Sequence, residues 1–297
     1  MRTVIAAAMT ICFGLMGAGS VFATSITLYG GNGGHNNGTS VNDGSLVLVD
    51  QTTGGISLIG HPDSVARLAG LTFDSAGTLW GSTLSPAFPA PPPPPATSSA
   101  LIRIDPATGA QLSSVAILFG VSPLSIADLA ADPFTGTLFG VTGPNGPGPA
   151  RLFTLNKTTG AATLVGSLGA SFASIAFSPG GTLYGSVASF AAGPINPRLV
   201  TIDPTTAAFL TSLGTTDFFG AFGIRPTDGA IFGGTGDEHE LFTVNALTGA
   251  ETLIGDTGLN FVGDLAFQPV PEPTTVVLFG SGLLAGLARR RRRRSSE

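Results

Sequence analysis

The sequence predicts an all-β protein whose body is a β-propeller of five four-stranded blades, closed by pairing between the first and last strands of the body. Three observations predict this fold class. Only 10% of the 297 residues are charged, whereas 43 are glycine and 22 are proline, which suits turns better than helices. A strand-and-turn unit recurs along the chain. The two ends of the body supply complementary parts of one more such unit.

The most recognisable part of the unit is its second strand, in which an aromatic residue precedes a glycine. Its copies read GTLWGST at 77–83, GTLFGVT at 136–142, GTLYGSV at 181–187 and GAIFGGT at 229–235. An apolar first strand and a Pro/Gly turn come before each copy. Short apolar runs bounded by turn residues are typical of antiparallel hairpins.

The third strand of the unit ends in Asp or Asn and is followed by a Thr-Gly turn and a fourth strand. Its copies read LVLVDQTTG, LIRIDPATG, LFTLNKTTG, LVTIDPTTA and LFTVNALTG. The Asp or Asn residues are Asp50, Asp105, Asn156, Asp203 and Asn245, at spacings of 55, 51, 47 and 42. An Asp or Asn side chain can accept hydrogen bonds from the following backbone, and Gly accepts positive φ. Four strands at this period indicate propeller blades, which must pack around an axis to bury both faces.

The ends of the body predict how the ring closes. Val262 to Gln268 (VGDLAFQ) is a first strand with no second strand after it, and Ser25 to Gly30 (SITLYG) is a second strand with no first strand before it. Leu46 to Val49 and Ile56 to Ile59 complete that blade. A split blade of this kind joins the two ends of the body and removes open sheet edges.

The N-terminal segment predicts export through the Sec machinery. Residues 1–23 contain one Arg, then an apolar stretch and small residues that end at Ala23, as in a secretory signal peptide with a short helix. We expect cleavage after Ala23. Cys12, the single cysteine, would be lost, so the mature chain would have no disulfide, thiol catalyst or cysteine metal site.

The C-terminus has three parts in a fixed order. Pro271, Glu272 and Pro273 form a stiff extended segment, and residues 274–288 follow without a charge. Fifteen such residues are fewer than the roughly 20 that span a bilayer, but snorkelling and local thinning can make up the difference. The chain then carries six arginines, which favour the cytoplasmic side: Arg289, Arg290, Arg291, Arg292, Arg293 and Arg294.

This tail resembles the PEP-CTERM sorting signal of Gram-negative bacteria over residues 270–294. The resemblance implies recognition by a membrane exosortase, initial membrane anchoring, and delivery to the cell surface or an extracellular matrix that usually contains exopolysaccharide. It implies nothing about the body, and an ordinary tail anchor is the alternative. The expected domains are a signal peptide at 1–23, a propeller at 24–269 and the sorting signal at 270–294, with a transmembrane helix at 274–288.

The charge of the body excludes one class of partner. The formal net charge of the chain is -5, but residues 25–268 contain six basic residues and 16 acidic ones, a charge of -10. Nucleic-acid binding requires Lys and Arg to neutralise phosphates, so we expect none.

The order of strands resembles NHL-type and lactonase-type propellers, in which the first strand of each blade lines the central channel. The connections from second to third strand would then share one face, the candidate binding face, because variable loops on a rigid scaffold often carry function. These connections are 31–45, 84–99, 143–150, 188–197 and 235–239. The polyproline run at 89–95 could be a recognition element or a spacer.

Three groups of residues are candidates for a metal site. At the start of the channel-lining strands the blades have Gly70, Asp128, Ser174, Ala221 and Asp264. Lactonase-like propellers hold a divalent metal there, whereas the alternative is that Asp128 and Asp264 each bond to the backbone. Asp237 to Glu240 could bind Ca²⁺ or remain solvated, and His35 to Gly38 with Asp43 forms a polar loop.

The predicted function is a non-catalytic, exported structural or binding module, with polysaccharide or envelope components as candidate ligands and no required cofactor. His35, His61 and His239 lie in separate segments, so no acid–base or nucleophilic arrangement is apparent. The alternative is a metal-dependent, lactonase-like hydrolase that uses Asp128 and Asp264 with Ca²⁺ or another divalent ion.

Overall fold

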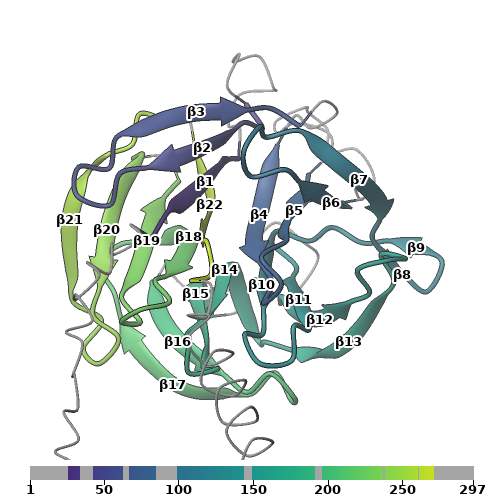
Figure 1. The fold of residues 1–297 in the computed structure, drawn as a ribbon. Coiled ribbons are helices and arrows are strands. Elements are labelled where there is room, and N and C mark those ends of the chain that lie inside the picture. The colour runs from purple at the N-terminus through teal and green to yellow at the C-terminus, as the bar shows by residue number, and fades with distance from the viewer. Residues whose placement is uncertain are drawn as a thin grey trace, which may run out of the picture.

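The fold was examined in a computed structural model, which describes residues 26–33, 43–62, 67–84, 99–143, 149–190, 196–236, 238–259 and 261–270. These residues form 22 strands and contain no helix. Five four-stranded antiparallel sheets surround a central axis (Figure 1). The predicted all-β fold class and the five blades are therefore confirmed.

Four of the blades are continuous in the chain, and each follows the predicted order of strands from the axis to the perimeter. The first contains β4 (Leu68–Phe73), β5 (Leu79–Thr83), β6 (Ala100–Ile104) and β7 (Gln111–Ala116). The second contains β10 (Asp128–Ala131), β11 (Leu138–Val141), β12 (Arg151–Leu155) and β13 (Ala162–Ser167). The third contains β14 (Ala170–Phe177), β15 (Leu183–Phe190), β16 (Arg198–Ile202) and β17 (Phe209–Gly214). The fourth contains β18 (Phe219–Ile224), β19 (Ile231–Thr235), β20 (Glu240–Val244) and β21 (Glu251–Asp256).

The fifth blade combines the two ends of the body, as the sequence predicts. Its strands are β22 (Val262–Phe267), β1 (Leu28–Asn32), β2 (Leu46–Val49) and β3 (Ile56–Gly60). β1 and β22 pair in antiparallel register from Leu28 opposite Phe267 to Gly31 opposite Asp264. The Gln268 N–H donates to the Thr27 carbonyl at 3.1 Å, which continues this pairing beyond the strands. The ring is therefore closed by hydrogen bonds between residues more than 230 positions apart.

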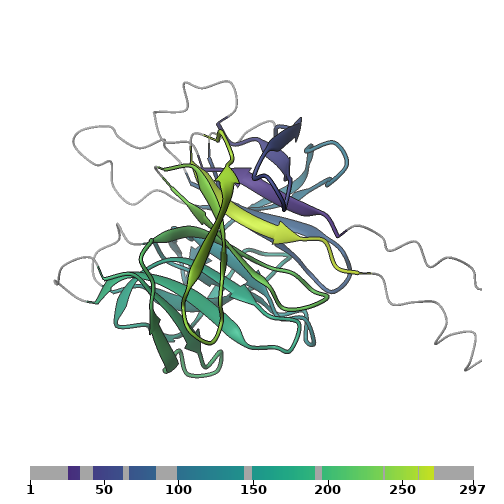
Figure 2. The same cartoon turned by 90° about the vertical axis from the view of Figure 1, so that its left-hand side faces the viewer.

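The innermost strands β22, β4, β10, β14 and β18 contact one another in that order around the axis. We call the end of the ring where these strands turn into the second strand of each blade the turn face. Its turns are at 74–78, 132–137, 178–182 and 225–230. We call the opposite end, from which second strands continue to third strands, the loop face. Figure 2 shows the start of β1 and the end of β22 on the same side of the propeller, and the hydrogen bond between Thr27 and Gln268 places both at the turn face.

The repeated Asp or Asn residues make the turns between third and fourth strands. The Asp50 Oδ1 accepts hydrogen bonds from the Thr52 and Thr53 N–H groups at 2.8 and 3.0 Å. Asp105, Asn156, Asp203 and Asn245 bond to the following backbone in the same way. Four of the turns contain a glycine with positive φ, and the fifth has Ala207 at φ 62° instead. The repeated Asp or Asn thus stabilises the same reversal of the chain in every blade.

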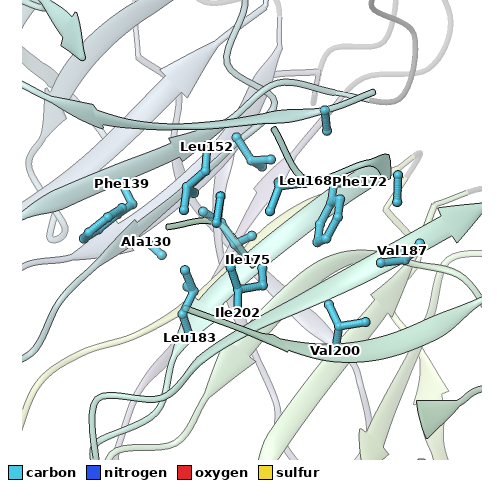
Figure 3. Close-up of a cluster of buried hydrophobic side chains, with 14 residues drawn as sticks. Ala130, Phe139, Leu152, Leu168, Phe172, Ile175, Leu183, Val187, Val200 and Ile202 are labelled. Carbon is cyan, nitrogen blue, oxygen red and sulfur yellow. The ribbon is translucent and has the colours of Figure 1, made fainter. Parts of the chain in front are cut away.

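The glycine in the second strand of each unit makes room for packing between side chains of its own blade. Gly185 lies opposite Ile175 in the sheet, and a Cβ added to it would be 2.5 Å from the Phe172 Cε1 and 3.0 Å from the Ile202 Cδ1. Gly81, Gly140 and Gly233 are similarly crowded, with side-chain atoms at 3.0 Å or less from an added Cβ. Phe172 and Ile202 belong to a core that also includes Phe139 and Leu152 of the preceding blade (Figure 3). A side chain at the motif glycine would therefore displace the core.

A short hairpin of β8 (Leu118–Phe119) and β9 (Ser122–Pro123) is an addition that the repeat did not predict. It lies between β7 and β10, with Gly120 at φ 64° in its turn. The Leu118 N–H donates to the Gly160 carbonyl at 3.1 Å, and the Phe119 ring meets Phe153 edge-on at 5.4 Å. The hairpin thus connects two neighbouring blades.

The packing around the motif glycine predicts the effect of replacing it. Gly185→Ala should lower the free energy of unfolding by about 1–3 kcal/mol because it overpacks a buried site. Gly214→Ala is a matched control, because an added Cβ there meets no atom within 4 Å and its φ is not positive. Denaturant unfolding of both variants checks this, and equal stabilities would contradict it.

Ring closure predicts the effect of removing the N-terminal strands. A chain that begins at residue 61 lacks β1, β2 and β3, so β22 loses its only sheet partner. We expect the shortened chain to lack the cooperative thermal unfolding transition that a chain of residues 24–270 shows. Calorimetry of the two chains checks the expectation, and a transition at nearly the same temperature would contradict it.

Candidate functional site

Two buried carboxyl groups lie at the centre of the ring, on innermost strands of different blades. Asp128 begins β10, Asp264 is in β22, and both are 0% exposed. The Asp264 carboxyl accepts hydrogen bonds from its neighbour Leu265 N–H at 2.7 Å and from Leu71 N–H of β4 at 2.5 Å. The Asp128 carboxyl accepts from Leu129 N–H and from Ile175 N–H of β14, both at 2.6 Å. Each aspartate therefore ties its own innermost strand to the next one around the ring.

The two carboxyl groups also hydrogen-bond to each other, which requires a proton between them. Burial raises the pKa of Asp128 to about 6, although its hydrogen bonds to Asp264 and to backbone N–H groups oppose the increase. Burial and the charge of Asp128 both raise the pKa of Asp264 well above its ordinary value. Burial and mutual repulsion therefore keep the pair from ionising fully, as expected for two acids in one dry site.

The oxygens of the acid pair are engaged by the backbone of the innermost strands. All four carboxyl oxygens accept backbone N–H hydrogen bonds, and a proton is shared between the two groups. The described residues contain no group of three or more His, Cys, Asp or Glu side chains that could hold a metal. The geometry matches the alternative that the sequence left open, in which each aspartate bonds to the backbone.

The other three positions predicted around the channel are small. Ser174 is buried beside Asp128, and Gly70 approaches the Asp128 backbone so closely that an added Cβ would be 2.8 Å from the Asp128 Cα. Ala221 is fully buried. The hydroxyl of Ser82 is buried without a hydrogen-bond partner. Small residues at these positions leave the space that the two carboxyl groups fill.

A ring of large apolar side chains separates the acid pair from the turn face. Each member follows directly after one of the five channel-lining positions, from Gly70 to Asp264, and all five members are at most 2% exposed. They are Leu71, Leu129, Ile175, Phe222 and Leu265. Each large side chain stands opposite the motif glycine of its own blade, for example Leu129 opposite Gly140. The repeat thus builds an apolar plug across the axis.

The plug is the base of a central pocket that opens on the turn face, with a cavity volume of about 290 Å³. Its walls contain aromatic residues from three innermost strands, Phe73, Phe177 and Phe267. Its rim contains a proline from each of four blades, Pro133, Pro179, Pro226 and Pro269. Val270, the last described residue, also lines it. All five blades contribute to this pocket, which is lined mainly by apolar residues although polar atoms make up as much of its exposed surface as carbon atoms do.

Asp74 is the acidic residue that lines the pocket, and side chains from β5 and from the neighbouring blade hold it in place. Its carboxyl accepts hydrogen bonds from Trp80 Nε1 at 3.0 Å and from Lys157 Nζ at 2.7 Å. Burial raises the pKa of Asp74, but the bonds from Lys157, Trp80 and the Thr78 backbone outweigh this and hold the pKa below its ordinary value. Asp74 is therefore an ionised anchor between blades.

The pocket lies on the opposite face from the one that the sequence favoured. The predicted loops do connect second and third strands at the loop face, but most of their residues, including the run at 89–95, lie outside the described residues. The turn face has only tight turns, so loop length gave no signal of a pocket there. The available signal was the large apolar residue that follows each channel-lining position, together with a Pro in the next turn.

The other candidate groups are described only in part. His35, Asp237 and the segment 36–38 lie outside the described residues. Glu238 is exposed, and His239 has φ 61° and accepts two hydrogen bonds from Thr257 through its carbonyl. The two ring nitrogens of His61 face the Asp43 and Pro62 carbonyls. These contacts fix loop backbone and do not build a cation site.

The predicted terminal segments also fall outside the described residues. They include Ala23, the Pro271 to Pro273 motif, the predicted membrane span at 274–288 and the arginine run at 289–294. Within the described part of the chain, no helix is long and apolar enough to cross a membrane.

Comparisons with known proteins identify the tail. Residues 269–293 match the family model of the PEP-CTERM protein-sorting motif, which confirms the resemblance seen in the sequence. A search of curated proteins found no match. The chain is similar to a chain in the crystal structure of a nidogen/laminin complex, with 15% identity, 81% of each chain covered and a TM-score of 0.49. It is also similar to a protein of unknown function from Bacteroides caccae, with 14% identity, 77% and 72% covered and a TM-score of 0.41.

The acid pair predicts an unusual dependence of stability on pH. Both pKa values are raised by folding, so the native state binds more protons than the unfolded state above about pH 4. The free energy of unfolding should therefore fall by a few kcal/mol as the pH rises from 4.5 through 6 to 8. Below pH 4 the lowered pKa of Asp74 acts in the opposite direction.

Denaturant unfolding across this pH range tests the acid pair. Asp264→Asn and Asp128→Asn each leave one buried carboxyl whose pKa is still raised by burial, so the decrease in stability between pH 4.5 and 8 should become smaller without disappearing. Stability that is constant or rises between pH 4.5 and 8 in the unmodified chain would contradict the assignment.

Proposed function

We propose that the protein is an exported, exosortase-sorted envelope or extracellular-matrix component whose propeller is a non-catalytic structural or binding module. The PEP-CTERM motif indicates export and membrane anchoring before sorting. The exosortase and the Sec machinery are the proposed partners in transit. The proposal adds two points to what the motif indicates. The final location is the envelope or the extracellular matrix, and the ligand is exopolysaccharide or another envelope component.

The observation that carries the proposal is the position of the motif relative to the fold. β22 ends at Phe267 and the matched motif begins at residue 269. The strand that closes the ring is thus the last element of the body, and the tail follows it directly. A sorting enzyme could cut or transfer the tail without removing any strand of the propeller.

The chemistry of the axis supports binding rather than catalysis. The central pocket exposes both apolar side chains and polar atoms, and five large apolar side chains lie between its base and the acid pair. The oxygens of Asp128 and Asp264 already accept backbone hydrogen bonds. The alternative, a metal-dependent lactonase-like hydrolase, would need these oxygens as ligands, and no contact in the described residues favours it.

The arginine run provides the test of sorting. Replacing Arg289 to Arg294 by glutamine removes the cytoplasmic charge that orients the short span, so an unsorted precursor should accumulate in the membrane fraction. A chain that ends at residue 270 is the control, and it should be exported and released in soluble form. Immunoblots of membrane, surface and medium fractions check both. Normal maturation of the glutamine variant would contradict the proposal.

A further inference from the structure

The turn face carries both the pocket and the exit of the tail. Thr27 and Gln268 are hydrogen-bonded at this face, and Pro269 and Val270 form part of the pocket rim. Figure 2 shows the start of β1 and the end of β22 on the same side of the propeller. The chain therefore leaves the body across the mouth of its own central pocket.

The segment between the pocket rim and the predicted membrane span is very short. Only Pro271, Glu272 and Pro273 separate Val270 from Thr274, where the uncharged run begins. Four residue steps cover at most about 14 Å when fully extended. A headgroup layer occupies about 5–7 Å of that distance on each side of a bilayer. The rim is therefore held within roughly 10 Å of the headgroup surface.

The loop face is too far from the tail exit to take this position. The innermost strands run from the loop face to the turn face, and the six residues of β18 span about 20 Å. A tether of about 14 Å cannot pass around the propeller and still reach the bilayer. The two prolines stiffen the tether further.

Attraction to lipid would not produce this arrangement without the tail. Residues 25–268 have a formal charge of -10. The two cations nearest the rim are already paired, Lys157 with Asp74 at 2.7 Å and Arg225 with Asp228 at 2.6 Å. An acidic body is repelled by anionic lipid, so the tether alone imposes the proximity.

We propose that the turn face is the bilayer-facing surface of the anchored protein, so that the central pocket opens to the surroundings only when the tail is released. This inference rests on the proposed anchoring function. It adds a consequence of sorting. Ligands in the envelope reach the pocket poorly while the protein is anchored, and release from the membrane exposes the pocket to them.

Single cysteines test the orientation, because Cys12 is the only cysteine and lies in the predicted signal peptide. Ala76→Cys and Thr227→Cys place a fluorophore on exposed positions of the turn face. Pro149→Cys and Glu238→Cys are matched controls on exposed positions of the loop face. Labelled chains of residues 24–297, which lack Cys12 and keep the tail, are placed in vesicles that contain a lipid with a nitroxide on its headgroup. Quenching should be several-fold stronger at the turn-face positions than at the loop-face positions.

A lengthened tether provides the second control. Twenty Gly/Ser residues inserted between Val270 and Pro271 add about 25 Å of flexible chain, which should remove the difference between the faces while the protein stays anchored. A bulky polyethylene-glycol maleimide should likewise modify Ala76→Cys several-fold faster in this variant than in the short-tether chain. The chain 24–270 should show no quenching at either face.

The outcomes separate the two proposals. Full-length protein that does not fractionate with membranes overturns the proposed function and the orientation with it. Anchored protein with equal quenching at both faces, or with stronger quenching at the loop face, overturns the orientation alone. An asymmetry that persists after insertion of the spacer overturns the short tether as the cause of the orientation, because affinity of the turn face for lipid would then produce it.

Discussion

Pairing between β1 and β22 is the constraint on which the rest of the structure depends. Each continuous blade has its four strands within one stretch of chain, but the fifth requires hydrogen bonds between the two ends of the body. This pairing closes the ring, brings five innermost strands to one axis and removes the exposed edges that a linear array would have. It also fixes where the chain leaves the fold, because β22 delivers Gln268 to the turn face. The location of the tail is thus a consequence of topology.

The closed ring creates a dry axis, and the sequence fills that axis in layers. Near the loop face, Asp128 and Asp264 share a proton and bind backbone N–H groups of the next innermost strand. A layer of five large apolar residues follows, and the pocket lies beyond it. A buried carboxyl pair is tolerated because every oxygen has a donor and only one charge remains. The pair therefore links neighbouring blades, and the apolar layer keeps it apart from the pocket.

The repeat made the fold predictable, because each turn is determined by a few consecutive residues that can be recognised in the sequence. The Asp203 turn, the glycine of GTLYGSV and the split blade could all be identified without coordinates. The pocket could not, because it depends on five side chains that are distant in sequence and equivalent only once the ring exists. The sequence predicts Asp128 and Asp264 as channel residues. Their burial and their hydrogen-bond partners depend on how each innermost strand is aligned with the next one around the ring, which the sequence does not give. The β8–β9 hairpin breaks the repeat and gave no periodic signal. The sequence favoured the face with the long loops as the binding face. The pocket lies instead on the turn face, where short turns from the blades meet around the axis.

Native-state hydrogen exchange of the β1 amides, Leu28 to Asn32, tests ring closure most directly. If β1 completes the fifth blade, the hydrogen-bonded amides of this strand should exchange only through global unfolding, as slowly as those of the innermost strand β14. Rapid exchange in β1 while β14 remains protected would show that the N-terminal strand is not part of the closed ring. The positions assigned to the tail and to the pocket rim would then lose their basis.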